Sequence, residues 1–172
     1  VNGVLFFSAS DLVNGRELWK SDGTATGTVV VKDIRAGSGS STPNSLTKLN
    51  GTLFFTANDG VNGIELWKSD GTEAGTVLVK DINPGSASSG CDLLTAAGGT
   101  LFLSAYTAAE GRELWRSDGS SAGTVLVKDI RPGASDSTPS NLIAFQGSLF
   151  FTASDGVSGV ELWRSDGSSA GT

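Results

Sequence analysis

The stretch Glu65-Leu66-Trp67-Lys68-Ser69-Asp70-Gly71-Thr72 decides the fold, because it recurs in register along the chain. Its tryptophan falls at positions 19, 67, 115 and 163, so successive copies are 48 residues apart, without insertion or deletion. A repeat of fixed length is typical of one supersecondary unit stacked on copies of itself. The sequence therefore predicts a single array, with repeats at approximately 1–48, 49–96, 97–144 and a partial repeat at 145–172.

The second repeat contains four short segments that favour β-strands. They are rich in apolar and β-branched residues and are bounded by turn residues; they cover residues 45–49, 52–57, 64–68 and 76–82. The Asn-Gly pair between the first two segments predicts a tight hairpin. Because the second segment is apolar on successive residues, we expect neighbouring sheets to cover both of its faces.

The array is predicted to be all-β. Glycine is abundant, at 24 residues, and long runs of helix-favouring residues are absent. Four strands per 48-residue period predict a β-propeller built from four-stranded antiparallel blades, about three and a half of them in this chain. A β-helix has shorter rungs, and a single sandwich does not repeat. Because the first and last repeats are incomplete, we expect a longer native chain or association with other copies.

The recurring motif also carries a family resemblance. In all four copies the chain resembles the bacterial ELWxxDGT repeat proteins, with serine in place of the final threonine at Ser120 and Ser168. The order of strands is similar to that of kelch-like blades, although the double glycine that usually closes the second kelch strand is absent. The resemblance implies a large secreted or cell-surface bacterial protein, and it brings no catalytic residues with it.

Composition excludes several classes of partner. The chain is 38% hydrophobic, and no apolar run approaches the roughly 18 residues of a membrane span, so we expect no membrane insertion. The formal net charge of −6 argues against nucleic acid, whose backbone requires a basic surface. The single cysteine, Cys91, aligns with prolines in other repeats, and we interpret it as a small residue in a loop rather than a reactive thiol.

The absence of histidine bears on catalysis. Without it, Ser-His-Asp and Cys-His nucleophile activation and histidine metal ligation are excluded, which leaves only carboxylate chemistry. A two-carboxylate glycosidase is therefore a distant alternative, and Glu110 is an acid outside the repeated pattern that could serve it. Most acidic residues recur with the repeat, so we predict that the protein is not an enzyme and has no catalytic residues.

The Asp-Gly pairs of the motif are predicted to form turns, with the carboxylate accepting backbone N–H groups and glycine taking positive φ. The alternative is a carboxylate cage for Ca²⁺, which needs six to eight oxygens. The loops at residues 58–60 and 154–156 suit a metal better, but residues 106–108, at the same position in the third repeat, include no carboxylate. We therefore predict no metal or cofactor site, with Ca²⁺ as the weaker alternative.

The tryptophans have two readings, as platforms for sugars or as packed core residues. If Ser69 pairs with Thr76 across the turn, Trp67 lies opposite Leu78 and Glu65 opposite Lys80. This register predicts a packed indole beside a cross-strand ion pair. The same register pairs Glu17 with Lys32 and Glu113 with Lys128.

Two functions remain open. The first is a non-catalytic extracellular or cell-surface module for adhesion, binding a glycan or a protein through loops at one end of the propeller. The second is a structural building block that self-assembles into a filament or surface coat. Residues that differ between repeats are the better candidates for recognition, and Arg16, Arg112 and Tyr106 are examples.

Overall fold

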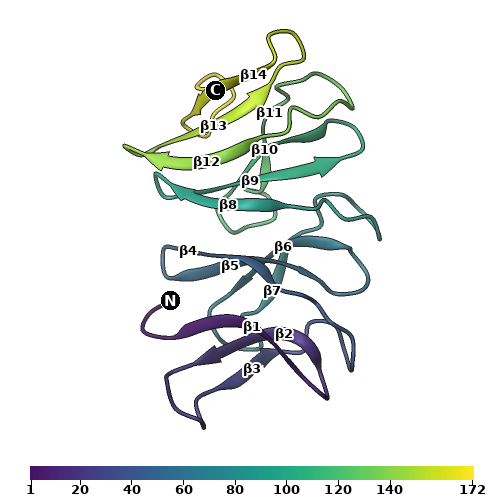
Figure 1. The fold of residues 1–172 in the computed structure, drawn as a ribbon, viewed down its shortest axis with the longest axis vertical. Coiled ribbons are helices and arrows are strands. Elements are labelled where there is room, and N and C mark those ends of the chain that lie inside the picture. The colour runs from purple at the N-terminus through teal and green to yellow at the C-terminus, as the bar shows by residue number, and fades with distance from the viewer. The chain divides into compact units, whose positions relative to one another are not determined.

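The computed structural model describes all residues, 1–172, and consists of strands joined by turns and loops. Fourteen antiparallel strands form four small sheets and no helix is present, which confirms the predicted all-β class. None of its segments is a helix able to span a membrane. The chain divides into two compact units, residues 1–88 and 89–172, and each unit holds two sheets (Figure 1).

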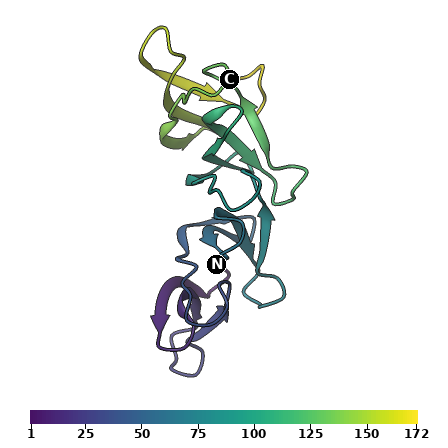
Figure 2. The ribbon, with the colours of Figure 1, turned by 90° about the vertical axis from the view of Figure 1, so that its right-hand side faces the viewer.

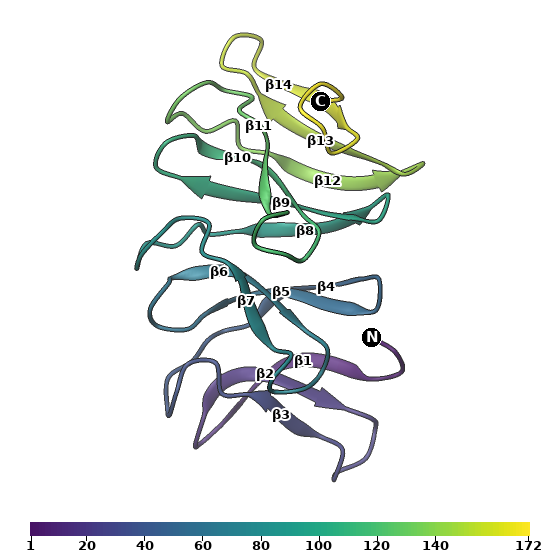
Figure 3. The ribbon, with the colours of Figure 1, turned by 180° about the vertical axis from the view of Figure 1, so that it is seen from behind.

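The first unit contains a three-stranded sheet followed by a four-stranded sheet. The three-stranded sheet comprises β1 (Leu5–Asp11), β2 (Gly15–Ser21) and β3 (Val29–Lys32). The four-stranded sheet comprises β4 (Asn44–Leu49), β5 (Thr52–Asn58), β6 (Ile64–Ser69) and β7 (Val77–Lys80). Every strand pairs with its neighbour in sequence, and Figure 3 shows β7 beside β6.

The second unit contains the same two kinds of sheet in the opposite order. The four-stranded sheet comprises β8 (Asp92–Ala97), β9 (Thr100–Thr107), β10 (Gly111–Ser117) and β11 (Val125–Lys128). The three-stranded sheet comprises β12 (Ser140–Phe145), β13 (Ser148–Ser154) and β14 (Val160–Ser165). The loop between β13 and β14 stands out from its sheet in Figure 2.

The predicted Asn-Gly hairpin joins β4 to β5. Leu49 pairs with Thr52, and the two residues between them have positive φ, 48° at Asn50 and 80° at Gly51. Two consecutive left-handed residues define the turn whose twist matches that of the flanking strands. The local sequence is therefore sufficient to place this turn.

The last strand of each complete sheet is shorter than predicted. Trp67 pairs with Leu78, as expected, but the ladder shifts between Leu66 and Trp67, so that Lys80 lies opposite Leu66. The same shift occurs between β2 and β3 and between β10 and β11. The extra residue of a β-bulge turns the strand out of its ladder, and β7 ends at Lys80 rather than at residue 82.

Each unit has a hydrophobic core between its two sheets. In the first unit, Leu18 and Ile34 pack in one buried cluster with Leu53, Phe55 and Trp67 of the next sheet. A matching cluster in the second unit contains the aligned residues Leu114, Ile130, Leu149, Phe151 and Trp163. Full burial of a side chain of this size stabilises a fold by about 1.5–3 kcal/mol, so these contacts hold each pair of sheets face to face.

Candidate functional site

The Asp-Gly loop after β6 is closed by its own side chains. Oδ1 of Asp70 accepts hydrogen bonds from the Thr72 amide at 2.8 Å and the Thr72 hydroxyl at 2.7 Å. The hydroxyls of Ser69 and Thr76 meet at 2.7 Å across its base. The loops after β2, β10 and β14 repeat both features. The prediction that the recurring aspartate is a turn residue is confirmed.

A second glycine of this loop has a role that the sequence did not reveal. A Cβ atom at Gly75 would lie 2.2 Å from Cγ of Asp70, much closer than non-bonded atoms approach. The equivalent glycines approach the aspartate of their own loops equally closely; they are Gly27, Gly123 and Gly171. Only glycine permits this close approach, which explains the invariant spacing of the loop.

Hydrogen bonding keeps these aspartates ionised. The pKa of Asp70 is lowered, first by the Thr72 hydroxyl and then by the Thr72 amide, and the pKa of Asp22 is lowered by the corresponding groups of Thr24. No three His, Cys, Asp or Glu side chains lie close enough together to hold a metal ion. The Asp70 and Asp22 carboxylates therefore serve their own loops.

The loops considered as the better metal candidates use their aspartate in a similar way. Oδ1 of Asp59 accepts the amides of Val61 and Asn62, both at 2.8 Å, and its Oδ2 accepts the Asn62 side chain. These hydrogen bonds lower the pKa of Asp59 against the opposing effect of burial, which is the largest single influence. Both carboxylate oxygens are thus engaged in shaping the loop between β5 and β6.

The predicted cross-strand register between the motif glutamates and the lysines is wrong. Because of the bulge, Lys32 lies opposite Leu18 rather than Glu17, and Lys80 and Lys128 are displaced from Glu65 and Glu113 in the same way. Lys32 instead donates to the carbonyl of Thr76 in the next sheet, at 2.9 Å. The lysine thus joins two consecutive repeats rather than two strands of one repeat.

The glutamate of the motif is a buried anchor for the chain that follows its sheet. Glu113 is 0% exposed, and its carboxylate accepts the amides of Ile130, Arg131 and Ser137 at 3.1, 3.3 and 3.2 Å. The Ser137 hydroxyl adds a bond of 2.6 Å. Glu17 is equally buried and binds the aligned groups of the first repeat. The glutamate carboxylate therefore accepts the backbone amides that no longer have a partner strand where the ladder of hydrogen bonds ends.

Burial has an electrostatic consequence at Glu113. Removal of the carboxylate from water raises its pKa, and the nearby Asp129 carboxylate adds to this effect. Hydrogen bonds from Ser137, Ile130 and Arg131 oppose the shift without cancelling it. The chemistry is that of a structural carboxylate, because its partners are three backbone amides and a serine hydroxyl of the segment that follows β11.

The tryptophans are packed rather than open. Trp67 and Trp115 are 6% and 8% exposed, so their indole faces are closed to a sugar ring. Trp163 is half-buried; it stacks on Phe151 with ring centroids 6.5 Å apart, and Nζ of Lys128 lies 5.8 Å from its ring. The packed reading of the tryptophans is confirmed.

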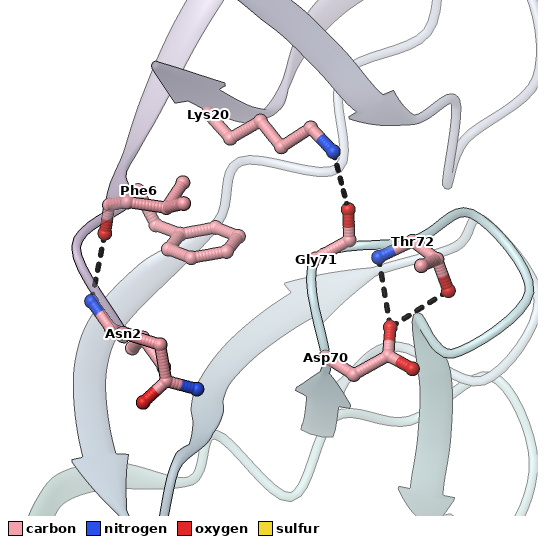
Figure 4. Close-up of a pocket in the computed structure, with 8 residues that line it drawn as sticks. Asn2, Phe6, Lys20, Asp70, Gly71 and Thr72 are labelled. Carbon is pink, nitrogen blue, oxygen red and sulfur yellow. Dashed lines mark hydrogen bonds between the residues drawn. The ribbon is translucent and has the colours of Figure 1, made fainter. Parts of the chain in front are cut away.

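A small pocket of the first unit lies where β1 meets the loop after β6. It has a volume of about 200 Å³ and is lined by Val1, Asn2, Val4, Phe6, Lys20, Asp70, Gly71 and Thr72. Figure 4 shows the Lys20 amine donating to the Gly71 carbonyl, at 2.8 Å, and the Asp70 carboxylate turned toward Thr72. Typical ligand pockets measure about 300–1,000 Å³, and the polar groups here already bind one another.

A more exposed feature lies at the loops that follow β1, β5 and β13. Their tips expose aliphatic side chains at one repeat position: Val13 is 70% exposed, Val61 68% and Val157 88%. Leu12, beside Val13, is fully exposed. The neighbouring aspartates hold the loops in place, since Asp11 and Asp155 accept the valine amides at 2.9 and 2.8 Å. These are rigid loops with apolar tips.

The residues that differ between repeats are not gathered into one site. Arg112 donates to the Gly90 carbonyl at 3.0 Å and lies 3.7 Å from the Asp92 carboxylate, so its charge is used locally. Glu110 accepts a short hydrogen bond from Thr107 within a single loop. The remaining candidates are scattered: Arg16 is exposed, Tyr106 is half-buried and Cys91 is buried.

Comparison with protein-family models, with curated proteins and with solved structures gives no match.

Proposed function

We propose that the chain is a non-catalytic extracellular or cell-surface module of bacterial type, built from β-propeller blades of the ELWxxDGT kind, that adheres to a protein partner. The fixed 48-residue period and, within each unit, the face-to-face packing of a three-stranded on a four-stranded antiparallel sheet support the propeller reading. The polar groups of the motif bind other groups of the same chain, which supports a role without catalysis. Asp70 accepts hydrogen bonds within its own loop, and Glu113 accepts backbone amides of the segment that follows its sheet.

The apolar loop tips, which recur at one repeat position, carry this proposal. Val13, Val61 and Val157 occupy one repeat position and expose an aliphatic side chain on a loop that an aspartate fixes. Contiguous exposed apolar patches mark interaction sites in soluble proteins, and the adjacent Leu12 and Val13 form such a patch at the first tip. A loop already held in one conformation loses little entropy on binding, which favours affinity.

The chemistry of the tips favours a protein over a glycan. Sugars are bound by open aromatic faces, but Trp67 and Trp115 are buried and the loop tips are aliphatic. Of the two predicted ligands, a glycan is therefore less well supported than a protein.

The proposal is tested with an array of secreted and cell-surface proteins printed beside an array of glycans. We expect saturable binding to a protein and at least a tenfold loss when Val13, Val61 and Val157 are all replaced by serine, with an unchanged melting temperature. The matched control is Glu73→Gln, also at an exposed loop position. Absence of protein binding, or equal binding by the triple variant, refutes the proposal.

The structural building block is a second candidate, because one contact between repeats recurs. Lys32 donates to the Thr76 carbonyl in the first unit, and Lys128 donates to the Thr172 carbonyl in the second. Additional copies could extend such a contact into a polymer. This candidate would be favoured over adhesion if light scattering showed concentration-dependent polymers and the chain bound no protein or glycan on the arrays.

A further inference from the structure

An arginine side chain lies against one apolar-tipped loop in each unit. In the first unit the stem of Arg35 packs on Gly60, where an added Cβ atom would lie 3.2 Å from Nε and 3.6 Å from Cγ of the arginine. In the second unit Arg131 packs on Gly156 in the same way, with its Nε 2.8 Å from such an atom. Each of these glycines immediately precedes an exposed valine, so each arginine adjoins an apolar tip.

The buried motif glutamates hold the backbone of these arginines. Glu17 accepts the Arg35 amide at 3.4 Å, and Glu113 accepts the Arg131 amide at 3.3 Å. The stem of Arg35 is confined on another side by Gly39, where a Cβ atom would lie 2.8 Å from the arginine Cγ. The backbone and stem are therefore positioned before a partner binds, which reduces the entropy lost on association.

The positive charge of these arginines has no carboxylate partner. Arg35 and Arg131 are exposed, and neither forms an ion pair. Arg131 donates one long hydrogen bond, of 3.4 Å, to the Asp136 carbonyl. Asp59, next to Gly60 in the chain, directs both carboxylate oxygens at donors of its own loop. Because packing on glycine uses only the aliphatic stem, the guanidinium is available to an acceptor from another molecule.

The sequence couples the arginine to the valine tip. Arg35 precedes a loop that reads Asp-Gly-Val, and so does Arg131. The aligned residue before the third loop is Asn83, which is buried and donates to the Ser88 carbonyl, and that loop reads Thr-Ala-Ala. In these three loops the cation and the exposed valine thus occur together or not at all.

We propose that Arg35 with Val61, and Arg131 with Val157, each bind an acidic segment of a partner protein in which a glutamate or aspartate lies beside an aliphatic residue. This inference rests on the proposed function, because it names the chemistry of the partner that the loop tips bind. The valine contacts the aliphatic group, and the guanidinium fork donates two parallel hydrogen bonds to the carboxylate. The formal net charge of −6 opposes this little, because exposed charges more than about 10 Å apart are largely screened at about 0.1 M salt.

The test uses the intact chain and an array of synthetic peptides. Each peptide has a Gly-Ser background with one leucine and one glutamate at varied separations, and a matched peptide carries glutamine in place of the glutamate. We expect at least threefold tighter binding to the glutamate peptides when the leucine and glutamate are adjacent or separated by one residue. The preference should disappear in Arg35→Gln/Arg131→Gln, and about 0.5 M sodium chloride should remove it as well.

The controls separate a local contact from a change in net charge. Lys48→Gln/Arg116→Gln removes two other exposed cations and should keep the preference for glutamate. A melting temperature shows whether the arginine variant keeps its fold, and the salt dependence, measured on the unchanged chain, tests the inference even if the variant unfolds. The inference is overturned if the folded arginine variant keeps the preference, if the matched control loses it, or if salt has no effect.

The remaining outcomes distinguish this inference from the proposed function. Equal binding of glutamate and glutamine peptides overturns the acidic partner, and loop-tip adhesion still stands if Val61→Ser/Val157→Ser removes that binding. Absence of peptide binding also overturns the inference, whereas the protein array tests the proposed function independently. Binding to sulfated glycans instead of acidic peptides overturns the assignment of a protein segment to this site.

Discussion

Glu113 and Glu161 occupy the same place in the motif, on two sheets of one unit, and have opposite surroundings. Glu113 is buried and accepts three backbone amides and a hydroxyl. Glu161 is exposed, on a strand whose outer edge carries no partner. The residue therefore gains its role from the chain segment that returns to it, and the motif alone does not provide that role.

The largest expected effect is the loss of the buried anchor. Glu113→Ala should reduce the free energy of unfolding by about 3–5 kcal/mol, because it leaves several buried donors without an acceptor. Glu161→Ala should change it by about 0.5 kcal/mol or less, as expected for an exposed residue. Urea denaturation of both variants measures the difference. Equal effects would break the comparison between the two sheets.

The next largest loss of stability is expected from a steric clash at Gly123. Gly123→Ala should cost about 1–3 kcal/mol, because its Cβ would lie 2.2 Å from Cγ of Asp118. Thermal unfolding of the single variants and of the double variant with Asp118→Ala measures the cost and its origin. Relief of the clash in the double variant is the expected result; additive losses would show that the glycine is required for another reason.

Lys128 is expected to contribute less. Lys128→Ala removes a hydrogen bond to the Thr172 carbonyl and a cation near the Trp163 ring, so a loss of about 0.5–1.5 kcal/mol is expected. Lys48→Ala, at an exposed lysine, is the matched control. If the control loses as much stability in urea as Lys128→Ala, the contact between the two sheets contributes nothing specific.

The smallest effect concerns a feature that the two sheets share. Hydrogen bonds from Ser120 and Ser168 lower the pKa of Asp118 and Asp166 below the ordinary value of 3.8. A lowered pKa in the folded state gives stability that is present above pH 3.8 and is lost as the pH falls through the folded pKa. Carboxyl chemical shifts should report midpoints below 3.8 at both sites.

The control for this titration is Asp118→Asn, which keeps an acceptor for the turn and removes the ionisable group. Its stability should depend less on pH below 3.8 than that of the unchanged chain. Glu113 should behave oppositely, since its raised pKa makes stability fall as the pH rises from 4.5 through the folded pKa. A midpoint for Glu113 below 4.5 would contradict the burial argument.

Local signals account for the features that the sequence predicts correctly. The Asn50-Gly51 turn requires two residues with positive φ, and the pairing of Trp67 with Leu78 follows from the hairpin geometry after it. The Asp70 turn is likewise formed within one loop. Each of these depends on residues close together in the chain, so their spacing is sufficient.

The β-bulge opposite Leu66 and Trp67 could not be predicted from the spacing of residues in the sequence. One extra residue moved Lys80 out of register with Glu65, and the Glu65 carboxylate accepts the amide of Ile82 in the segment beyond the strand. Glu17 shows the outcome most fully, since Ile34 and Ser41 are 17 and 24 residues away. The apolar tips at Val13 and Val61 were also missed, although their equal repeat positions were a visible signal.

The sequence by itself determined the 48-residue period, the all-β class, the turns and the packing role of the tryptophans, because these follow from alternation, spacing and local backbone preference. Only the tertiary structure decided that Glu113 is completely buried and which groups Lys32 and Glu113 bind. The physical reason is that burial and hydrogen-bond partners come from segments distant in the chain. The residues beside Glu113 in the sequence do not encode which distant segment will pack against it.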